Sequence, residues 1–105
     1  MLLLSRADIK SVFSMNDSIE AVKKAFMLYS DGKSEVPLRT NIQVPEHNGT
    51  LLFMPAYVGE LDTASLKIVN IFPENMKKGL PTAPAQVLLI DTTTGIVVAV
   101  LDGTY

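Results

Sequence analysis

The spacing of apolar and polar residues divides the chain into a helical first part and an extended second part. Residues 5–13 place apolar side chains on one face of a short helix, and Ser5 nearly opens a capping box with the acid three positions later. A second helix is predicted to begin at Asn16 or Asp17 and to end near Gly32. Its apolar positions have helical spacing and form one stripe, which consists of Ile19, Val22, Phe26 and Tyr29.

Beyond the second helix the pattern changes to the two-residue period of half-buried strands. This alternation predicts five strands, at residues 38–44, 50–56, 63–72, 85–90 and 96–101. The Asn48-Gly49 pair suits a turn with positive φ and predicts a first hairpin, and the Thr-rich turn ending at Gly95 predicts a second. Residues 73–81 are expected to form a loop, and residues 2–4 a short buried strand or an entry segment.

The order of these elements predicts an α+β domain. Two N-terminal helices are followed by a mainly antiparallel sheet of about five to six strands. The length of 105 residues fits one domain, and the chain stops directly after a strong strand. Its six glycines are scattered and form neither G-x-G-x-x-G nor a P-loop. A self-contained dinucleotide site is therefore not expected.

Composition and charge exclude several other functions. The formal net charge of −2 argues against a general nucleic-acid binder, which normally has a basic excess. The absence of cysteine excludes a disulfide scaffold and a thiolate zinc site. The single histidine, His47, lies in a turn-like string and is expected to be solvated, so no metal site is predicted. No apolar run reaches the ~18 residues of a membrane span, and a cytoplasmic location is expected by default.

Two basic residues lie inside predicted strands and are candidates for binding a ligand. Lys67 is flanked by apolar residues inside a predicted strand, and Arg39 lies on the polar side of another. If both converge on a hollow, they suit a small carboxylate, which arginine can bind with two hydrogen bonds. The alternative is that Arg39 is solvated and that Lys67 faces solvent on an edge strand, where lysine discourages aggregation. Met54 fits either a ligand-binding wall or ordinary core packing.

An ordered set of strings along the chain resembles the ornithine cyclodeaminase/mu-crystallin family. The strings are Val36-Pro37-Leu38-Arg39-Thr40, Leu52-Phe53-Met54-Pro55-Ala56-Tyr57, Leu66-Lys67-Ile68-Val69-Asn70, Gly79-Leu80-Pro81-Thr82 and Leu88-Leu89-Ile90-Asp91-Thr92-Thr93-Thr94-Gly95, followed by Ala99-Val100-Leu101-Asp102-Gly103. They cover nearly the whole chain. The family contains ornithine cyclodeaminases, alanine dehydrogenases and ketimine reductases, about three times as long as this chain.

The resemblance implies that residues 1–105 form a substrate-binding and dimerisation domain, without the Rossmann domain that binds NAD or NADP in the family. It implies that Arg39 and Lys67 bind the carboxylate of a small amino-acid or imino-acid substrate. Lys67 would also assist proton transfer, Met54 would line the pocket, and Thr82 would lie near the nicotinamide. A homodimer is implied as well. The isolated chain is expected to be inactive and to bind no dinucleotide tightly.

Two departures from the family pattern refine this reading. Ornithine cyclodeaminases tend to place a glutamate two residues before the Met-Pro pair, where it meets the distal amine of the substrate, whereas this chain has Leu52. An apolar residue there would leave a distal ammonium unpaired, which favours an alanine dehydrogenase or ketimine reductase type of substrate. Many relatives have His-Gln after the position of Thr82, whereas this chain has Ala83-Pro84.

The alternative function is a non-catalytic one. Crystallin-type relatives accumulate as structural proteins, and a stand-alone domain of this kind could act as a dimeric small-ligand binder. Neither alternative predicts a nucleic-acid partner or a membrane partner.

Overall fold

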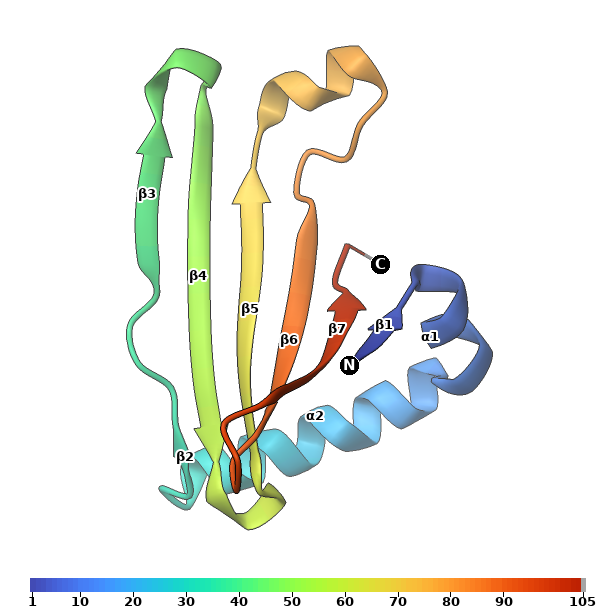
Figure 1. The fold of residues 1–105 in the computed structure, drawn as a ribbon, viewed down its shortest axis with the longest axis vertical. Coiled ribbons are helices and arrows are strands. Elements are labelled where there is room, and N and C mark those ends of the chain that lie inside the picture. The colour runs from blue at the N-terminus through green and yellow to red at the C-terminus, as the bar shows by residue number, and fades with distance from the viewer. Residues whose placement is uncertain (105) are drawn as a thin grey trace.

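The computed structural model describes residues 1–104, which form two α-helices and a seven-stranded sheet. The helices are α1 (Arg6–Val12) and α2 (Met15–Ser30). The strands are β1 (Leu2–Leu4), β2 (Ser34–Glu35), β3 (Thr40–Val44), β4 (Gly49–Val58), β5 (Thr63–Ile71), β6 (Ala85–Asp91) and β7 (Val97–Asp102). Short 3-10 helices η1 (Pro45–His47), η2 (Gly59–Leu61) and η3 (Pro73–Lys78) connect them (Figure 1).

The strands run in the order β1-β7-β6-β5-β4-β2, with β3 also paired to β4. Every pair is antiparallel except β1 with β7, so the predicted α+β class and the mainly antiparallel sheet are confirmed. The sheet has one strand more than the upper prediction because β2 is only two residues long. A strand of that length has too few positions to show an alternating pattern.

Local turn chemistry behaves as the sequence predicts. Asn48 has φ 52° and ends η1 before β4, which makes the first hairpin between β3 and β4. Gly95 has φ 75° in the turn between β6 and β7, which makes the second hairpin. The predicted loop at residues 73–81 contains η3, which ends at Gly79 with φ 69°. Glycine takes this left-handed conformation without a steric penalty.

Both helices begin with a reciprocal capping box. In α1 the Ser5 hydroxyl accepts from the Asp8 amide, and the Asp8 carboxylate accepts from the Ser5 amide at 2.9 Å. The same pair of bonds joins Ser14 and Asp17 in α2. The predicted cap at Asn16 or Asp17 is therefore wrong by two or three residues, because Asp17 serves as the third residue of the box.

The sheet has two faces that differ in burial. We call the face that carries Met54, Lys67 and Val87 the lysine face, since these residues are paired across β4, β5 and β6. The opposite face carries the paired Ile68 and Gln86 together with Asn70, and we call it the asparagine face. Helix α2 crosses the end of the sheet where β4 finishes (Figure 1). It lies on the lysine face, because Ala56 of that face shares a cavity with α2.

The buried apolar core is small and lies on one side of the sheet. It consists of Leu28 of α2 and three lysine-face residues, Leu52, Ala85 and Ala99. The radius of gyration is 15.3 Å, whereas a compact domain of this length has about 13 Å. The described chain therefore leaves much apolar surface open.

The apolar stripe of α2 is largely open to solvent, and the buried strand that was one reading of residues 2–4 is not observed. The predicted α2 stripe is 45 to 67% exposed at Ile19, Val22, Phe26 and Tyr29, because α2 meets the sheet mainly near its C-terminal end. Residues 2–4 do form a strand, but β1 is an edge strand, and Leu2 and Leu3 are exposed.

Candidate functional site

Lys67 and Met54 are directly opposite each other on neighbouring strands. Their Cα atoms are partners in the antiparallel pair of β4 and β5, so both side chains leave the same face of the sheet. Lys67 is exposed and Met54 is half-buried. The Lys67 ammonium group is therefore accessible to solvent, and the Met54 side chain lies beside the aliphatic part of Lys67.

Lys67 is the only Lys or Arg within the seven strands of the described chain. It lies on β5, between β4 and β6, and not on an edge strand. The alternative that explained this lysine as protection of a sheet edge is therefore wrong, although its exposure to solvent is observed. A central strand needs no charge to prevent edge-to-edge pairing.

Arg39 lies one residue before β3 in an irregular segment. Glu35 is paired with Tyr57, and Thr40 is paired with Phe53. Residues 36–39, four residues, thus lie opposite residues 54–56, three residues, which is the mismatch of a β-bulge. Arg39 is exposed and is next to the strand that carries Met54. Arg39 therefore lies beside β4, on the side of that strand away from β5 and Lys67.

The neighbours of Lys67 on its face are apolar or uncharged. Leu52, which is 7% exposed, precedes Met54 by two positions and is opposite Val69. Val87 is the partner of Lys67 on the other side. Lys67 therefore projects from an apolar surface. An anionic group of a ligand would meet one cation there, with few other polar groups nearby.

Thr82 is not part of this group. Its carbonyl accepts a hydrogen bond from the Phe72 amide at 2.8 Å, beyond the end of β5. Five residues separate Phe72 from Lys67, which corresponds to about 17 Å along an extended strand. Among the four predicted site residues, Met54 and Lys67 are paired across β4 and β5, and Arg39 precedes β3 on the other side of β4. Thr82, which is exposed, lies beyond the end of β5.

The titratable groups with shifted pKa values lie elsewhere. Backbone and hydroxyl hydrogen bonds from Ser5 and Ser14 lower the pKa of Asp8 and Asp17, the two capping-box acids. The hydroxyl and then the amide of Thr93 lower the pKa of Asp91 in the second hairpin turn. A 2.7 Å contact with Glu60 raises the pKa of Lys33. These exposed groups stabilise turns and caps.

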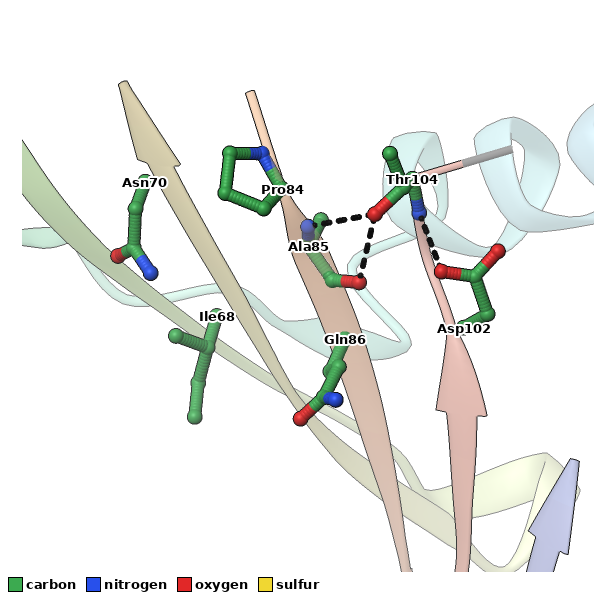
Figure 2. A pocket seen from close by; sticks show the side chains of 7 residues that line it. All are labelled: Ile68, Asn70, Pro84, Ala85, Gln86, Asp102 and Thr104. Atoms are coloured by element: carbon green, nitrogen blue, oxygen red, sulfur yellow. Dashed lines mark hydrogen bonds between the residues drawn. The ribbon is translucent and has the colours of Figure 1, made fainter. Parts of the chain in front are cut away.

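A second polar region, which sequence reasoning missed, lies on the asparagine face. Figure 2 shows a cavity of about 310 Å³ between β5, β6 and β7. Its lining residues are Ile68, Asn70, Pro84, Ala85, Gln86, Asp102 and Thr104. The only available signal was the polar Asn70 at an inward position of an otherwise apolar run.

Some kinds of site are absent from residues 1–104. No group of three or more His, Cys, Asp or Glu side chains is arranged to hold a metal ion within this range. None of the helices found there is long and apolar enough to cross a membrane. His47 is exposed, as predicted.

The sequence profile described as the ornithine cyclodeaminase/mu-crystallin family matches residues 1–105. The chain is 38% identical over 104 residues to an alanine dehydrogenase of Archaeoglobus fulgidus, covering 99% of this chain and 31% of that protein. It thus spans about a third of the length of this relative.

Two solved structures have the same fold. One is the Δ1-pyrroline-2-carboxylate reductase of Thermococcus litoralis in complex with NADH and L-proline, with 47% identity and a TM-score of 0.95. It is matched over 99% of this chain and 32% of its own. The other is an archaeal alanine dehydrogenase dimer with bound NAD, with 38% identity and a TM-score of 0.92, matched over 100% of this chain and 32% of its own.

Proposed function

Because the chain belongs to the ornithine cyclodeaminase/mu-crystallin family, we propose that it is the substrate-binding part of an NAD(P)-dependent oxidoreductase of small amino acids and their imines. The preferred substrate class is a cyclic imino acid such as Δ1-pyrroline-2-carboxylate, the substrate class named for the 47% identical relative. Pyruvate with ammonia, the corresponding substrates of an alanine dehydrogenase, is the second candidate, in line with the 38% identical relative.

The observation that carries this proposal is the lone cation of the lysine face. Lys67 stands opposite Met54 on a central strand, with Arg39 on the segment beyond β4. A carboxylate held by an ammonium and a guanidinium gains charge-assisted hydrogen bonds from both. The rest of a small substrate then lies against apolar side chains, which fixes its reacting carbon relative to the anchored carboxylate.

Leu52 supports the choice of substrate class. It occupies the position where ornithine cyclodeaminases tend to carry a glutamate, and it is buried beside Met54 on the lysine face. A distal ammonium near Leu52 would lose its hydration without gaining a partner. A proline-like ring or the methyl group of alanine gains from the same surface.

The chemistry divides between this chain and the cofactor. In the reduction of an imine, the nicotinamide supplies a hydride to the carbon of the C=N bond, and the nitrogen gains a proton. Lys67 would hold the carboxylate next to that carbon and assist the proton transfer to the nitrogen. Thr82 would face the nicotinamide end of the bound dinucleotide.

The described residues do not by themselves fit a dinucleotide. Glycines with positive φ occur at Gly32, Gly79 and Gly95, where they end a helix, a 3-10 helix and a hairpin turn. None opens a phosphate-binding helix, which a dinucleotide site requires. We expect the 105-residue chain alone to be inactive and to bind NADH only weakly.

The proposed function is tested with the complete gene product that contains this chain. Oxidation of NADH and NADPH is followed with Δ1-pyrroline-2-carboxylate, with pyruvate plus ammonia, and with ornithine plus NAD as the control for cyclodeaminase activity. We expect the cyclic imino acid to have the highest kcat/KM. Faster turnover of ornithine would contradict the substrate class, and no turnover of any substrate would favour a non-catalytic binder or a crystallin-like structural protein.

We also propose that the protein is a homodimer. An apolar row crosses the asparagine face from β4 to β1. The row consists of Pro55, Leu66, Leu88, Val100 and Leu3. Burying such a row favours association, and the 38% identical alanine dehydrogenase is called a dimer. Light scattering that gives a monomer mass at high concentration would contradict this proposal. A cytoplasmic location remains a prediction.

A further inference from the structure

We propose that Asn75 is the positioning residue of Thr82. This inference rests on the proposed function, in which Thr82 faces the nicotinamide end of the dinucleotide. Asn75 itself contacts neither cofactor nor substrate in this proposal. It acts through the backbone on either side of Thr82, by fixing the direction in which the threonine side chain points.

The segment that carries Thr82 continues the sheet beyond β5 and β6. The Asn70 amide donates to the Pro84 carbonyl at 3.0 Å, and the Phe72 amide donates to the Thr82 carbonyl at 2.8 Å. These two bonds continue the antiparallel register of β5 and β6. Proline has no N–H group, so Pro84 returns no bond to β5. The segment is therefore held by fewer backbone bonds than a full strand pair.

Asn75 supplies a further contact to this segment. Its side-chain amide donates to the Pro81 carbonyl at 2.8 Å. The backbone of Asn75 is hydrogen-bonded as well, because its amide donates to the Phe72 carbonyl and its carbonyl accepts from the Leu80 amide, each at 3.0 Å. Asn75 is half-buried, whereas the other residues of η3 are exposed. The residue that binds Pro81 is thus itself held in place from both ends of the loop.

These bonds fix both peptide groups that flank Thr82. A peptide group is planar, so the Pro81 carbonyl and the Thr82 amide turn together. Asn75 holds this first group through the Pro81 carbonyl, and Phe72 holds the second group through the Thr82 carbonyl. When both planes are fixed, the two backbone dihedral angles of Thr82 are fixed as well, and the direction of its side chain follows.

The base of the loop is anchored to β4. Gly49 is the first residue of β4 and is buried. The Phe72 ring occupies the space where a Cβ atom at this position would lie, so only glycine leaves room for the ring. The amide that binds the Thr82 carbonyl therefore comes from a residue that is packed against the sheet.

The Thr82 side chain is available to a ligand. It is exposed, and its hydroxyl forms no hydrogen bond among residues 1–104. The other residues of segment 81–84 are Pro81, Ala83 and Pro84, which have no polar side-chain atoms. A hydroxyl both donates and accepts, and a carboxamide offers both kinds of partner. A free hydroxyl on a fixed backbone is a preorganised binding group, which loses little entropy when the ligand binds.

The test is a double-mutant cycle in the complete gene product, with the Kd for NADH measured by fluorescence titration, which requires no turnover. Thr82→Val removes the hydroxyl and should raise the Kd about fivefold, as expected for the loss of one hydrogen bond. Asn75→Asp keeps the side-chain shape, but an ionised carboxylate cannot donate to the Pro81 carbonyl, so the Kd should rise by a similar factor. The double variant should bind NADH no more weakly than Thr82→Val, because Asn75 acts only through Thr82.

Two further variants separate positioning from a general structural role. Asn75→Ala removes the donor without adding a charge and should repeat both results. Lys78→Gln changes the charge of η3 by the same amount as Asn75→Asp and should leave the Kd unchanged. A normal Kd in Asn75→Asp, losses that multiply in the double variant, or unfolding of both Asn75 variants would overturn the positioning role alone. An unchanged Kd in Thr82→Val, or no NADH binding by the unaltered protein, would overturn the proposed function and this inference with it.

Discussion

The two faces of one sheet carry different information about this protein. On the lysine face lie the buried strand residues Leu52, Ala85 and Ala99 together with Lys67, and α2 lies over the end of β4. On the asparagine face, an apolar row lies next to a cavity lined by Asn70, whose Oδ1 atom has no hydrogen bond among residues 1–104. Successive residues of β5 point to alternate faces, so Lys67 and Asn70, which are three positions apart, lie on opposite faces of the sheet.

This difference teaches that burial and chemistry must be assessed for each face separately. The lysine face combines the core with the candidate carboxylate site, so a change there affects both stability and substrate binding. The asparagine face has no buried apolar side chain in the described chain and can tolerate change unless a second copy or a ligand covers it. Four comparisons of variants or conditions can break or sharpen this contrast.

The largest effect on activity is expected from removal of the Lys67 ammonium group. In the complete gene product, Lys67→Ala should lower kcat/KM for Δ1-pyrroline-2-carboxylate about 100-fold, which corresponds to about 3 kcal/mol of lost carboxylate binding. Lys67→Arg should recover part of the loss, since the charge is kept. Lys24→Ala, at an exposed position of α2, should keep normal kinetics in the same steady-state assay. Normal turnover in Lys67→Ala would show that the assigned role is wrong.

The next effect compares adjacent residues on opposite faces. Leu52→Glu should lower the free energy of unfolding of the chain by about 3 kcal/mol, because a buried leucine is replaced by a carboxylate without a partner. Leu51→Glu, on the half-buried asparagine face, should cost about 1 kcal/mol. Urea unfolding followed by circular dichroism measures both. Equal losses would mean that the two faces do not differ as described.

A smaller effect tests how α2 is held over the lysine face. Ser14→Ala removes the hydroxyl that accepts from the Asp17 amide at 3.1 Å and should cost about 1 kcal/mol in the same urea experiment. Ser18→Ala, within the same helix, is the control and should change stability by less than about 0.5 kcal/mol. If both variants behave alike, the capping box does not stabilise α2.

The smallest expected effect is on the stability of the chain at acidic pH. Hydrogen bonds in the folded chain lower the pKa of Asp8, Asp17 and Asp91, so the unfolded chain binds their protons at a higher pH. Their contribution to stability is complete above the ordinary aspartate pKa of about 3.9 and is lost as pH falls through the lower folded values. Urea midpoints between pH 6 and pH 2 should decline more gently in Asp91→Asn than in the unaltered chain. An unchanged slope would contradict the assigned role of Asp91.

Local features of the fold could be predicted because they depend on near neighbours in the sequence. The Ser5 capping box, the turn at Asn48 and the glycine turn at Gly95 all require only residues within four positions. The strands with full alternation were also predictable. Strand β2 was not, because its two residues are held only by pairing with β4.

Burial was predicted less well because it depends on what lies across the fold. The α2 stripe has the periodicity of a buried face, yet Phe26 is 67% exposed, since periodicity shows which side of a helix is apolar and not what covers it. For the candidate site, the sequence singled out Lys67, Met54 and Arg39. Only the strand register showed that Met54 and Lys67 are paired and that Thr82 is distant from both.

The sequence by itself determined the class of the fold, the caps, the hairpins and the family, because each follows from short-range patterns or from ordered motifs. The tertiary structure decided which face of each strand is buried, that Lys67 lies on a central strand, and that the buried Asn70 oxygen has no hydrogen-bond partner among residues 1–104. Those properties depend on pairing between residues far apart in the chain, and the pairing register exists only once the sheet has formed.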